Sequence, residues 1–134
     1  MSGWTNEELE RIAGTDELDI SWLREDGSLG GPRTIWVVQV DDALYVRSVH
    51  GRQGIWLRGT QRRHEGHVSV GGVEKDVTFE DADADADLAG RIDDAYNAKY
   101  RARYPPSYTD DTLTPQAKGA TLKLAPRERS PRHE

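Results

Sequence analysis

The chain has 134 residues, of which 35% are hydrophobic and 31% are charged, and its formal net charge is −6. This length predicts one domain, and the acidic balance disfavours broad attraction to nucleic acid or to anionic membrane. The absence of cysteine excludes a disulfide framework and thiolate-bound zinc. No apolar run approaches the roughly 20 residues of a membrane span, and the first residues, MSGWTNEELER, lack the pattern of a signal peptide. We therefore expect a cytoplasmic protein with no membrane partner.

The first predicted element is a short helix over residues 6–13. Thr5 and Glu8 have the spacing of a capping box, and Trp4 can pack on Leu9 as a hydrophobic staple. Gly14 stands where a glycine commonly ends a helix.

Residues 17–23, ELDISWL, predict a half-buried strand. Apolar and polar residues alternate there, which places Leu18, Ile20 and Trp22 on one side. The segment REDGSLGGPR, residues 24–33, predicts a loop because Asp-Gly and Gly-Gly-Pro break regular structure.

The run TIWVVQV, residues 34–40, is apolar on both faces and rich in β-branched residues. This pattern predicts a central strand. A tight turn at Asp41 and Asp42 then leads into the next predicted strand, LYVRSV, over residues 44–49.

The clearest hairpin is HVSVGGVEKDVTF, residues 67–79. Two short strands are joined there by the two-residue turn Gly71-Gly72. A longer helix follows over residues 88–100, with apolar residues at helical spacing, and the prolines at 105 and 106 end it.

The acidic repeat EDADADAD, residues 80–87, precedes this helix. A metal site or an acidic recognition tract is one interpretation. An N-cap with first-turn acids that complement the helix dipole is the one we favour.

The last predicted strand is ATLKLAP, residues 120–126, with Leu122 and Leu124 facing inward. We expect residues 3–127 to form a single domain and residues 128–134 to form a disordered tail. Many short antiparallel strands with few helices favour a mainly β (α+β) fold, a small barrel.

Positive charge is concentrated between residues 43 and 64, where the chain has five arginines, two histidines and no acidic residue. Arg47 lies within a predicted strand, and a buried cation needs a counter-charge. A bound anion and an acid folded over from elsewhere in the chain are both open. Ser48, the Thr60 hydroxyl and the backbone around Gly51 and Gly54 could complete a phosphate cradle.

Aromatic side chains accompany these arginines. Trp36, Trp56 and Tyr45 offer flat apolar surfaces to a ring system. For Trp56 a place in the core is the alternative. For Arg62 and Arg63 we expect solvation or pairing with the acidic helix.

Several segments together resemble the bacterial family called domain of unknown function 2255. They are WTNEELERIAGTDELDI, GPRTIWVVQVDDALYVRSVHGRQGIWLRG, DADLAGRIDDAYNAKY and ATLKLAPR. That family is similar to the split β-barrels that bind flavin or deazaflavin, which include pyridoxamine phosphate oxidases and deazaflavin-dependent nitroreductases. The resemblance implies a six-stranded antiparallel split β-barrel with a short N-terminal helix and one longer helix before the last strand. It also implies a homodimer.

The resemblance also implies which residues contact a cofactor. In the nitroreductase branch a strand ends in a glycine turn, and a tryptophan then begins a short helix, as in YVRSVHGRQGIWLRG. The implied contacts are Arg47, Ser48, Gly51, Arg52, Trp56 and Arg58. Arg33, in GGPRT, is a second-rank candidate. The chain departs from the pattern, since this loop has one cation and no counterpart of the oxidases' substrate-binding residues is visible.

The predicted function is that of an oxidoreductase-like protein that binds FMN or deazaflavin and acts on a small organic metabolite. His50 or Tyr45 would donate a proton to the substrate. A cofactor-free cyclase or isomerase that uses His50 as acid or base, with Tyr45 nearby, is an alternative.

Binding modules form a third class of function. His50, His64 and His67 could bind zinc or supply a haem ligand, but their spacing matches no strong metal signature, so we predict no metal site. Haem or another small molecule in the same groove stays an alternative. Single-stranded nucleic acid on the arginine patch is disfavoured by the net charge.

Overall fold

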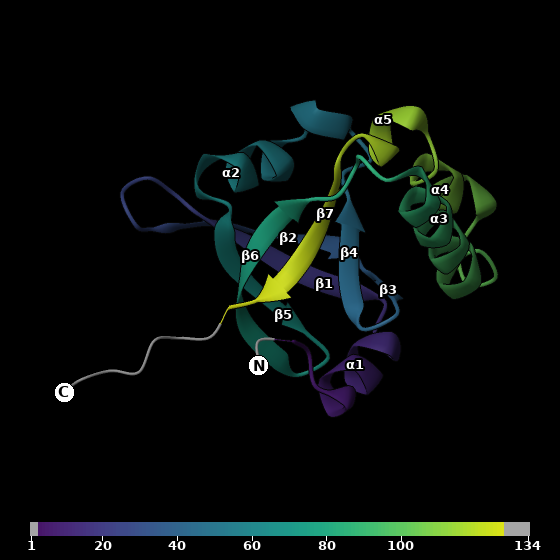
Figure 1. Cartoon of the computed structure of the whole chain (residues 1–134), viewed down its shortest axis with the longest axis horizontal. Coiled ribbons are helices and arrows are strands. Elements are labelled where there is room, and N and C mark those ends of the chain that lie inside the picture. Colours follow the sequence, from purple (N-terminus) through teal and green to yellow (C-terminus); the bar gives the residue numbers. More distant parts are fainter. Residues whose placement is uncertain (1–2, 128–134) are drawn as a thin grey trace.

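The structure is a computed structural model that describes residues 3–127. The predicted disordered tail, residues 128–134, lies outside the described residues. Within the described range the chain forms seven strands and five α-helices, with one short 3-10 helix (Figure 1). The strands are β1 Glu17–Leu23, β2 Leu29–Trp36, β3 Val38–Val40, β4 Ala43–Arg47, β5 Glu65–Val70, β6 Val73–Asp81 and β7 Thr121–Pro126. The helices are α1 Asn6–Ala13, η1 Gly51–Gln53, α2 Ile55–Arg63, α3 Ala86–Tyr100, α4 Pro106–Asp111 and α5 Pro115–Lys118.

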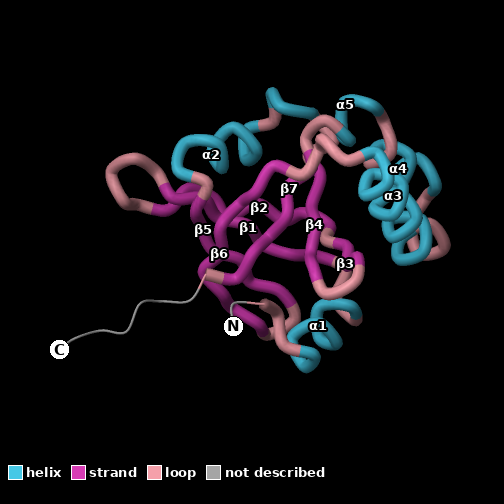
Figure 2. The backbone as a smooth tube through the Cα atoms, viewed as in Figure 1, coloured by secondary structure: helices cyan, strands magenta, loops and turns pink. Residues whose placement is uncertain are grey.

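All seven strands belong to one antiparallel sheet in the order β2-β1-β5-β6-β7-β4-β3. The sheet curls into a half-barrel with the helices outside it (Figure 2). Helices α3 and α4 lie beside β3 and β4, and α2 lies on another side of the barrel (Figure 1). The antiparallel split-barrel architecture is therefore present, but the predicted six strands and two helices are too few.

The prediction of one central strand over residues 34–40 was wrong. The chain breaks at Val37, so that β2 and β3 stand at opposite ends of the strand order. Val37 packs in the core inside the barrel, whereas Val38 and Val40 pack in a second core beneath α3. The run is apolar on both faces because it contacts two separate cores. A central place in the sheet is not needed to explain it.

The predicted loop over residues 24–33 was also wrong in its second half, because β2 begins at Leu29. Gly30 and Gly31 lie against the Trp22 ring, and a Cβ on Gly30 would stand only 2.2 Å from Trp22 Nε1. These glycines allow the close approach of a strand to an indole ring, which is a second use of glycine besides turns.

Local sequence signals were confirmed where they were strong. The Thr5–Glu8 capping box is present at α1, and the Trp4 indole donates a hydrogen bond to the Leu124 carbonyl over 2.9 Å. The β5–β6 hairpin turns through Gly71 and Gly72, which have φ of +57° and +82°, as a primed turn requires.

Helix α3 begins where the acidic repeat predicted an N-cap. The Asp85 side chain accepts a hydrogen bond from the Leu88 backbone N–H, and Asp87 lies in the first turn. The prolines end α3 as expected, but Pro106 also begins α4, and neither α4 nor α5 was predicted. No helix among the described residues is long and apolar enough to cross a membrane.

Strand β4 connects the two cores. Leu44 and Val46 face the barrel interior, and Tyr45 faces the second core, which α3 covers with Ile92 and Tyr96. Burial on both faces fixes the end of β4, where the basic stretch begins.

Candidate functional site

A cleft opens where β2 and β4 approach each other without pairing, and α2, α3 and α4 complete its walls. Its volume is about 290 Å³. We call it the split cleft; its lining residues are Thr34, Ile35, Trp36, Arg47, Val49, Trp56, Tyr96, Tyr108, Asp111 and Thr112.

Aromatic side chains dominate the walls of the split cleft. Trp36 is stacked on Tyr100, with ring centroids 3.9 Å apart and planes at 1° to each other. Trp56 is 9% exposed and also packs in the barrel core, so the core interpretation of this residue is confirmed together with its place on the cleft wall. Such fixed rings suit a flat apolar ligand.

Tyr96 also contributes to this cleft. Its hydroxyl oxygen is fully buried, and the backbone of Arg47 is its hydrogen-bonding neighbour. Burial raises the pKa of Tyr96 far above its ordinary value, and the Arg47 cation and backbone oppose this rise. The ring of Tyr96, rather than its hydroxyl, forms part of the cleft wall.

Arg47 lies at the base of the split cleft with its side chain fully buried. It forms an ion pair with Asp93 over 2.5 Å and donates to the Thr121 hydroxyl and to the carbonyls of Thr112 and Ala89. Of the two partners left open by the sequence, the structure therefore provides the internal acid.

Three further predicted contacts lie behind the split cleft, next to α5. Ser48 is buried, its hydroxyl lacks a partner, and a Cβ on Gly54 would stand 2.5 Å from that oxygen. Gly51 has φ of +71° and its α-carbon faces Gln116. Arg52 donates to the Gly119 carbonyl and pairs with Asp83 over 3.4 Å. These residues shape the turn before α2, and none of them lines the split cleft.

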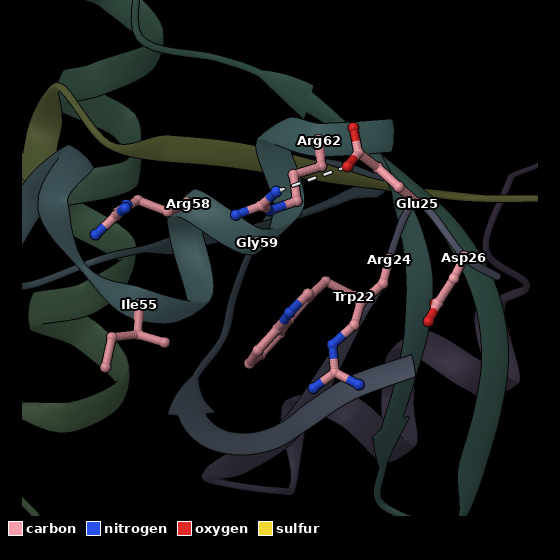
Figure 3. A pocket seen from close by; sticks show the side chains of 8 residues that line it. All are labelled: Trp22, Arg24, Glu25, Asp26, Ile55, Arg58, Gly59 and Arg62. Carbon is pink, nitrogen blue, oxygen red and sulfur yellow. Dashed lines mark ion pairs between the residues drawn. The ribbon is translucent and has the colours of Figure 1, made fainter. Parts of the chain in front are cut away.

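Arg58 lies on another face of α2 from Trp56, in a second and larger cavity of about 580 Å³ between α2 and the β1–β2 connection. We call it the arginine pocket; it is lined by Trp22, Arg24, Glu25, Asp26, Ile55, Arg58, Gly59 and Arg62 (Figure 3). The structure thus does not bring Arg58 together with Arg47 and Trp56.

The two predicted proton donors are not brought together either. Tyr45 is buried beneath α3, and burial raises the pKa of its hydroxyl. His50 is exposed at the start of η1, and its side chain makes no hydrogen bond with the part of the chain that the structure describes. Arg33 is exposed on β2, next to Thr34 of the cleft wall, and has no ion-pair partner among the described residues.

The other histidines have protein partners. His64 ends α2 with φ of +56°, and its Nδ1 lies 3.2 Å from the Phe79 carbonyl oxygen. His67 lies 3.1 Å from Asp76 on the hairpin. Within residues 3–127, no group of three or more His, Asp or Glu side chains is arranged to hold a metal ion.

Several cavity residues escaped the sequence analysis. Tyr96 and Trp22 looked like ordinary core residues, and Arg24 fell in a predicted loop. Arg62 is 56% exposed, as the expectation of a solvated side chain predicted, and it faces Glu25 across the arginine pocket over 4.0 Å. Spacing along the chain contains no signal for these long-range placements.

Three solved structures share the fold. A conserved hypothetical protein from Mycobacterium tuberculosis has a TM-score of 0.65 at 9% identity, covering 96% of this chain and 82% of that chain. A candidate pyridoxamine 5′-phosphate oxidase from Listeria innocua has a TM-score of 0.66 at 13% identity, covering 92% of this chain and 93% of that chain. The haem storage protein HutZ from Vibrio cholerae has a TM-score of 0.67 at 10% identity, covering 92% of this chain and 91% of that chain. At such identities the likeness establishes the fold alone.

No curated protein matches the chain significantly. A family profile does, as the resemblance of the short segments predicted. It covers residues 8–124, and the chain therefore belongs to domain of unknown function 2255, a family described as uncharacterized proteins conserved in bacteria.

Proposed function

We propose that this protein is an oxidoreductase-like cytoplasmic homodimer that binds FMN or a deazaflavin in the split cleft and acts on a small organic metabolite. The observation that carries the proposal is the split cleft itself, a cavity at the open side of a split barrel with Trp36, Trp56 and Tyr96 in its walls. A bound flavin or deazaflavin would supply the electron-transfer chemistry, and the protein would supply binding and orientation.

The residues of the cleft fit the ring of such a cofactor better than its phosphate. Fixed aromatic walls suit a flat ring. Arg47 is already paired, so the phosphate would need another cation. Arg33 fits this role because it is exposed, unpaired and adjacent in sequence to the cleft wall. Since Tyr45 is buried elsewhere, His50 is the proposed proton donor.

The proposed homodimer is supported by apolar side chains that a lone chain leaves in water. Val49 and Tyr108 at the split cleft are 41% and 54% exposed. A second copy on this face would cover these side chains, and exposed apolar groups of this kind are typical of interfaces.

Absorption and fluorescence titrations with FMN and with a deazaflavin test the proposal. We expect saturable binding that Arg33→Gln weakens about tenfold, which corresponds to one charge-assisted contact. Arg91→Gln is the matched control, because Arg91 is an exposed arginine paired with Asp41 and lies outside the split cleft. If neither FMN nor the deazaflavin bound, the result would contradict the proposal.

A cofactor-free enzyme or small-molecule binder is the second candidate, and one observation favours it. The split cleft holds about 290 Å³, at the lower limit of the roughly 300–1,000 Å³ that ligand pockets usually have. A small metabolite would fill this volume without a phosphate contact. Binding of neutral heterocycles, with no response to flavin, deazaflavin or haem, would support this candidate.

A further inference from the structure

The arginine pocket differs from the split cleft in chemistry as well as in place. Three arginines line it, one from the end of β1 and two from α2, and Figure 3 shows the Trp22 ring between them. Of these three arginines, only Arg58 was predicted from the sequence to bind a ligand, together with Trp56. The cavity of about 580 Å³ is large enough for a small ligand.

Two acidic side chains face the three arginines of this pocket, so they offset only part of its positive charge. Asp26 accepts hydrogen bonds from the backbone and the hydroxyl of Ser28, at 3.0 and 2.7 Å, and its charge interacts with that of Arg24. Glu25 reaches Arg62 only at 4.0 Å, the limit of an ion pair. Arg58 has neither an ion pair nor a hydrogen bond through its side chain within residues 3–127.

A neutral donor accompanies these cations. The Trp22 indole N–H has no acceptor among the described residues. Four side-chain atoms of that range are fully buried and unpartnered, and Trp22 Nε1 is not one of them, so it remains open to the cavity. The ring is held in place because Gly30 and Gly59 lie directly against it. The donor therefore has a fixed position, as a binding site requires.

An apolar surface lies at the same pocket. Ile55 is 63% exposed, which is unusual for a large aliphatic side chain at the first turn of a helix. A ligand that carried only charge would leave Ile55 in water.

From these features we infer that the arginine pocket binds a small organic oxyanion, a carboxylate or a phosphate monoester with an apolar group attached. Arg58 and the Trp22 N–H would donate to the oxyanion, Arg62 would add charge, and Ile55 would contact the apolar group. Guanidinium groups bind both kinds of oxyanion in this way. The inference is independent of the proposed cofactor, because the residues concerned do not line the split cleft.

The test uses benzoate and phenyl phosphate as probes, with benzamide as the neutral analogue and inorganic phosphate as the anion without an apolar group. Binding is followed through the tryptophan indole signals in nitrogen–proton correlation spectra, and Trp22→Phe identifies the Trp22 signal. We expect at least one organic anion to shift this signal saturably, and added salt to weaken the effect. Which of the two binds more tightly identifies the oxyanion.

The decisive variant is Arg58→Gln, and Arg63→Gln is its matched control on the same helix. Arg63 pairs with Glu65 and lies outside the pocket. We expect Arg58→Gln to weaken probe binding about tenfold and Arg63→Gln to leave it unchanged. Equal effects of the two variants, equal binding of benzamide, binding of inorganic phosphate as tight as that of phenyl phosphate, or no shift of the Trp22 signal by any anion would each overturn the inference.

Discussion

Arg47 and Arg58 belong to the same basic stretch, yet the fold gives them opposite surroundings. Arg47 is fully buried in the region beneath α3, where its guanidinium meets a carboxylate, a hydroxyl and two carbonyls. Arg58 is exposed in the region beside α2, where no acceptor from residues 3–127 meets it. The first region satisfies its cation internally, and the second leaves its cation available.

This difference shows that a lack of acidic residues near an arginine in the sequence does not reveal which group that arginine meets in the fold. Asp93, the partner of Arg47, lies 46 residues away on α3. Burial of a guanidinium costs much free energy of desolvation. The folded chain must therefore supply a partner for it if the protein is to be stable without a ligand. The exposed arginine has no such requirement. Arg47 and Arg58 had the same predicted role, and of the two only Arg47 has an acid as its partner among the described residues.

Replacement of Arg47 by methionine should have the largest effect on stability, because Arg47 is the buried arginine of the two. The variant leaves Asp93 without its buried partner, and losses of this kind cost about 3–5 kcal/mol. We expect a lower free energy of unfolding in urea, by about that amount. Lys118→Ala is the control, because Lys118 pairs with the same carboxylate over 3.1 Å but is 41% exposed, so it should cost less than about 1 kcal/mol. Equal losses in the two variants would show that the buried pair is not special.

A methyl group at Gly59 tests the other region, the arginine pocket around Arg58. A Cβ there would stand 2.4 Å from Trp22 Cδ1, so Gly59→Ala should displace the ring, cost about 1–3 kcal/mol and weaken anion binding. Gly90→Ala is the matched control on α3, where nothing lies within 4 Å of the added Cβ. It should stabilise by up to about 1 kcal/mol. A Gly59→Ala protein as stable as the Gly90→Ala protein would mean that the side chains of the arginine pocket rearrange to make room for the added methyl group.

The sequence predicted those parts of the fold whose cause is local. A capping box, a Gly-Gly turn and an N-cap before α3 each act within a few residues, and all three are present. The strand β2 was missed in part because its glycines serve the Trp22 ring, which comes from another strand. The break at Val37 was missed because two cores produce the same two-sided apolar pattern as one central strand.

Prediction of the site residues was limited in the same way, because contacts between residues distant in sequence decide which cavity a side chain lines. Trp56 was placed among flat surfaces for a ring, and it lies in the wall of the split cleft. Arg58 was placed beside it, although two positions along a helix turn side chains to different faces, and α2 puts them in separate cavities. That helix was implied only by the family resemblance. The resemblance listed Trp56 and Arg58 as contacts of one cofactor, and spacing along the chain does not show which face of the helix each side chain takes.

Lys99 extends the comparison to a buried cation that can lose its charge. Its ammonium group donates to the carbonyls of Val37 over 2.9 Å and Ile12 over 3.3 Å. Burial lowers the pKa of Lys99 to about 8, with Arg103 adding to this effect and the nearby Asp16 opposing it. The acceptors of Lys99 are thus neutral carbonyls, whereas Arg47 also meets a carboxylate.

The smallest of the expected effects follows from this pKa. Between pH of about 8 and about 10.5 the unfolded chain binds more protons at Lys99 than the folded chain does, so this residue makes stability rise with pH in that window. The measurement is the free energy of unfolding of the wild-type protein minus that of Lys99→Met, at about pH 7 and about pH 10. We expect the difference to favour the wild type more at the higher pH. Burial also raises the pKa of Tyr100, which removes stability at the alkaline end, but the subtraction largely cancels this because both proteins retain that residue. A difference that stays constant with pH would mean that Lys99 titrates as a solvated lysine. Lys99 would then keep its charge in the folded protein across this range, despite its burial.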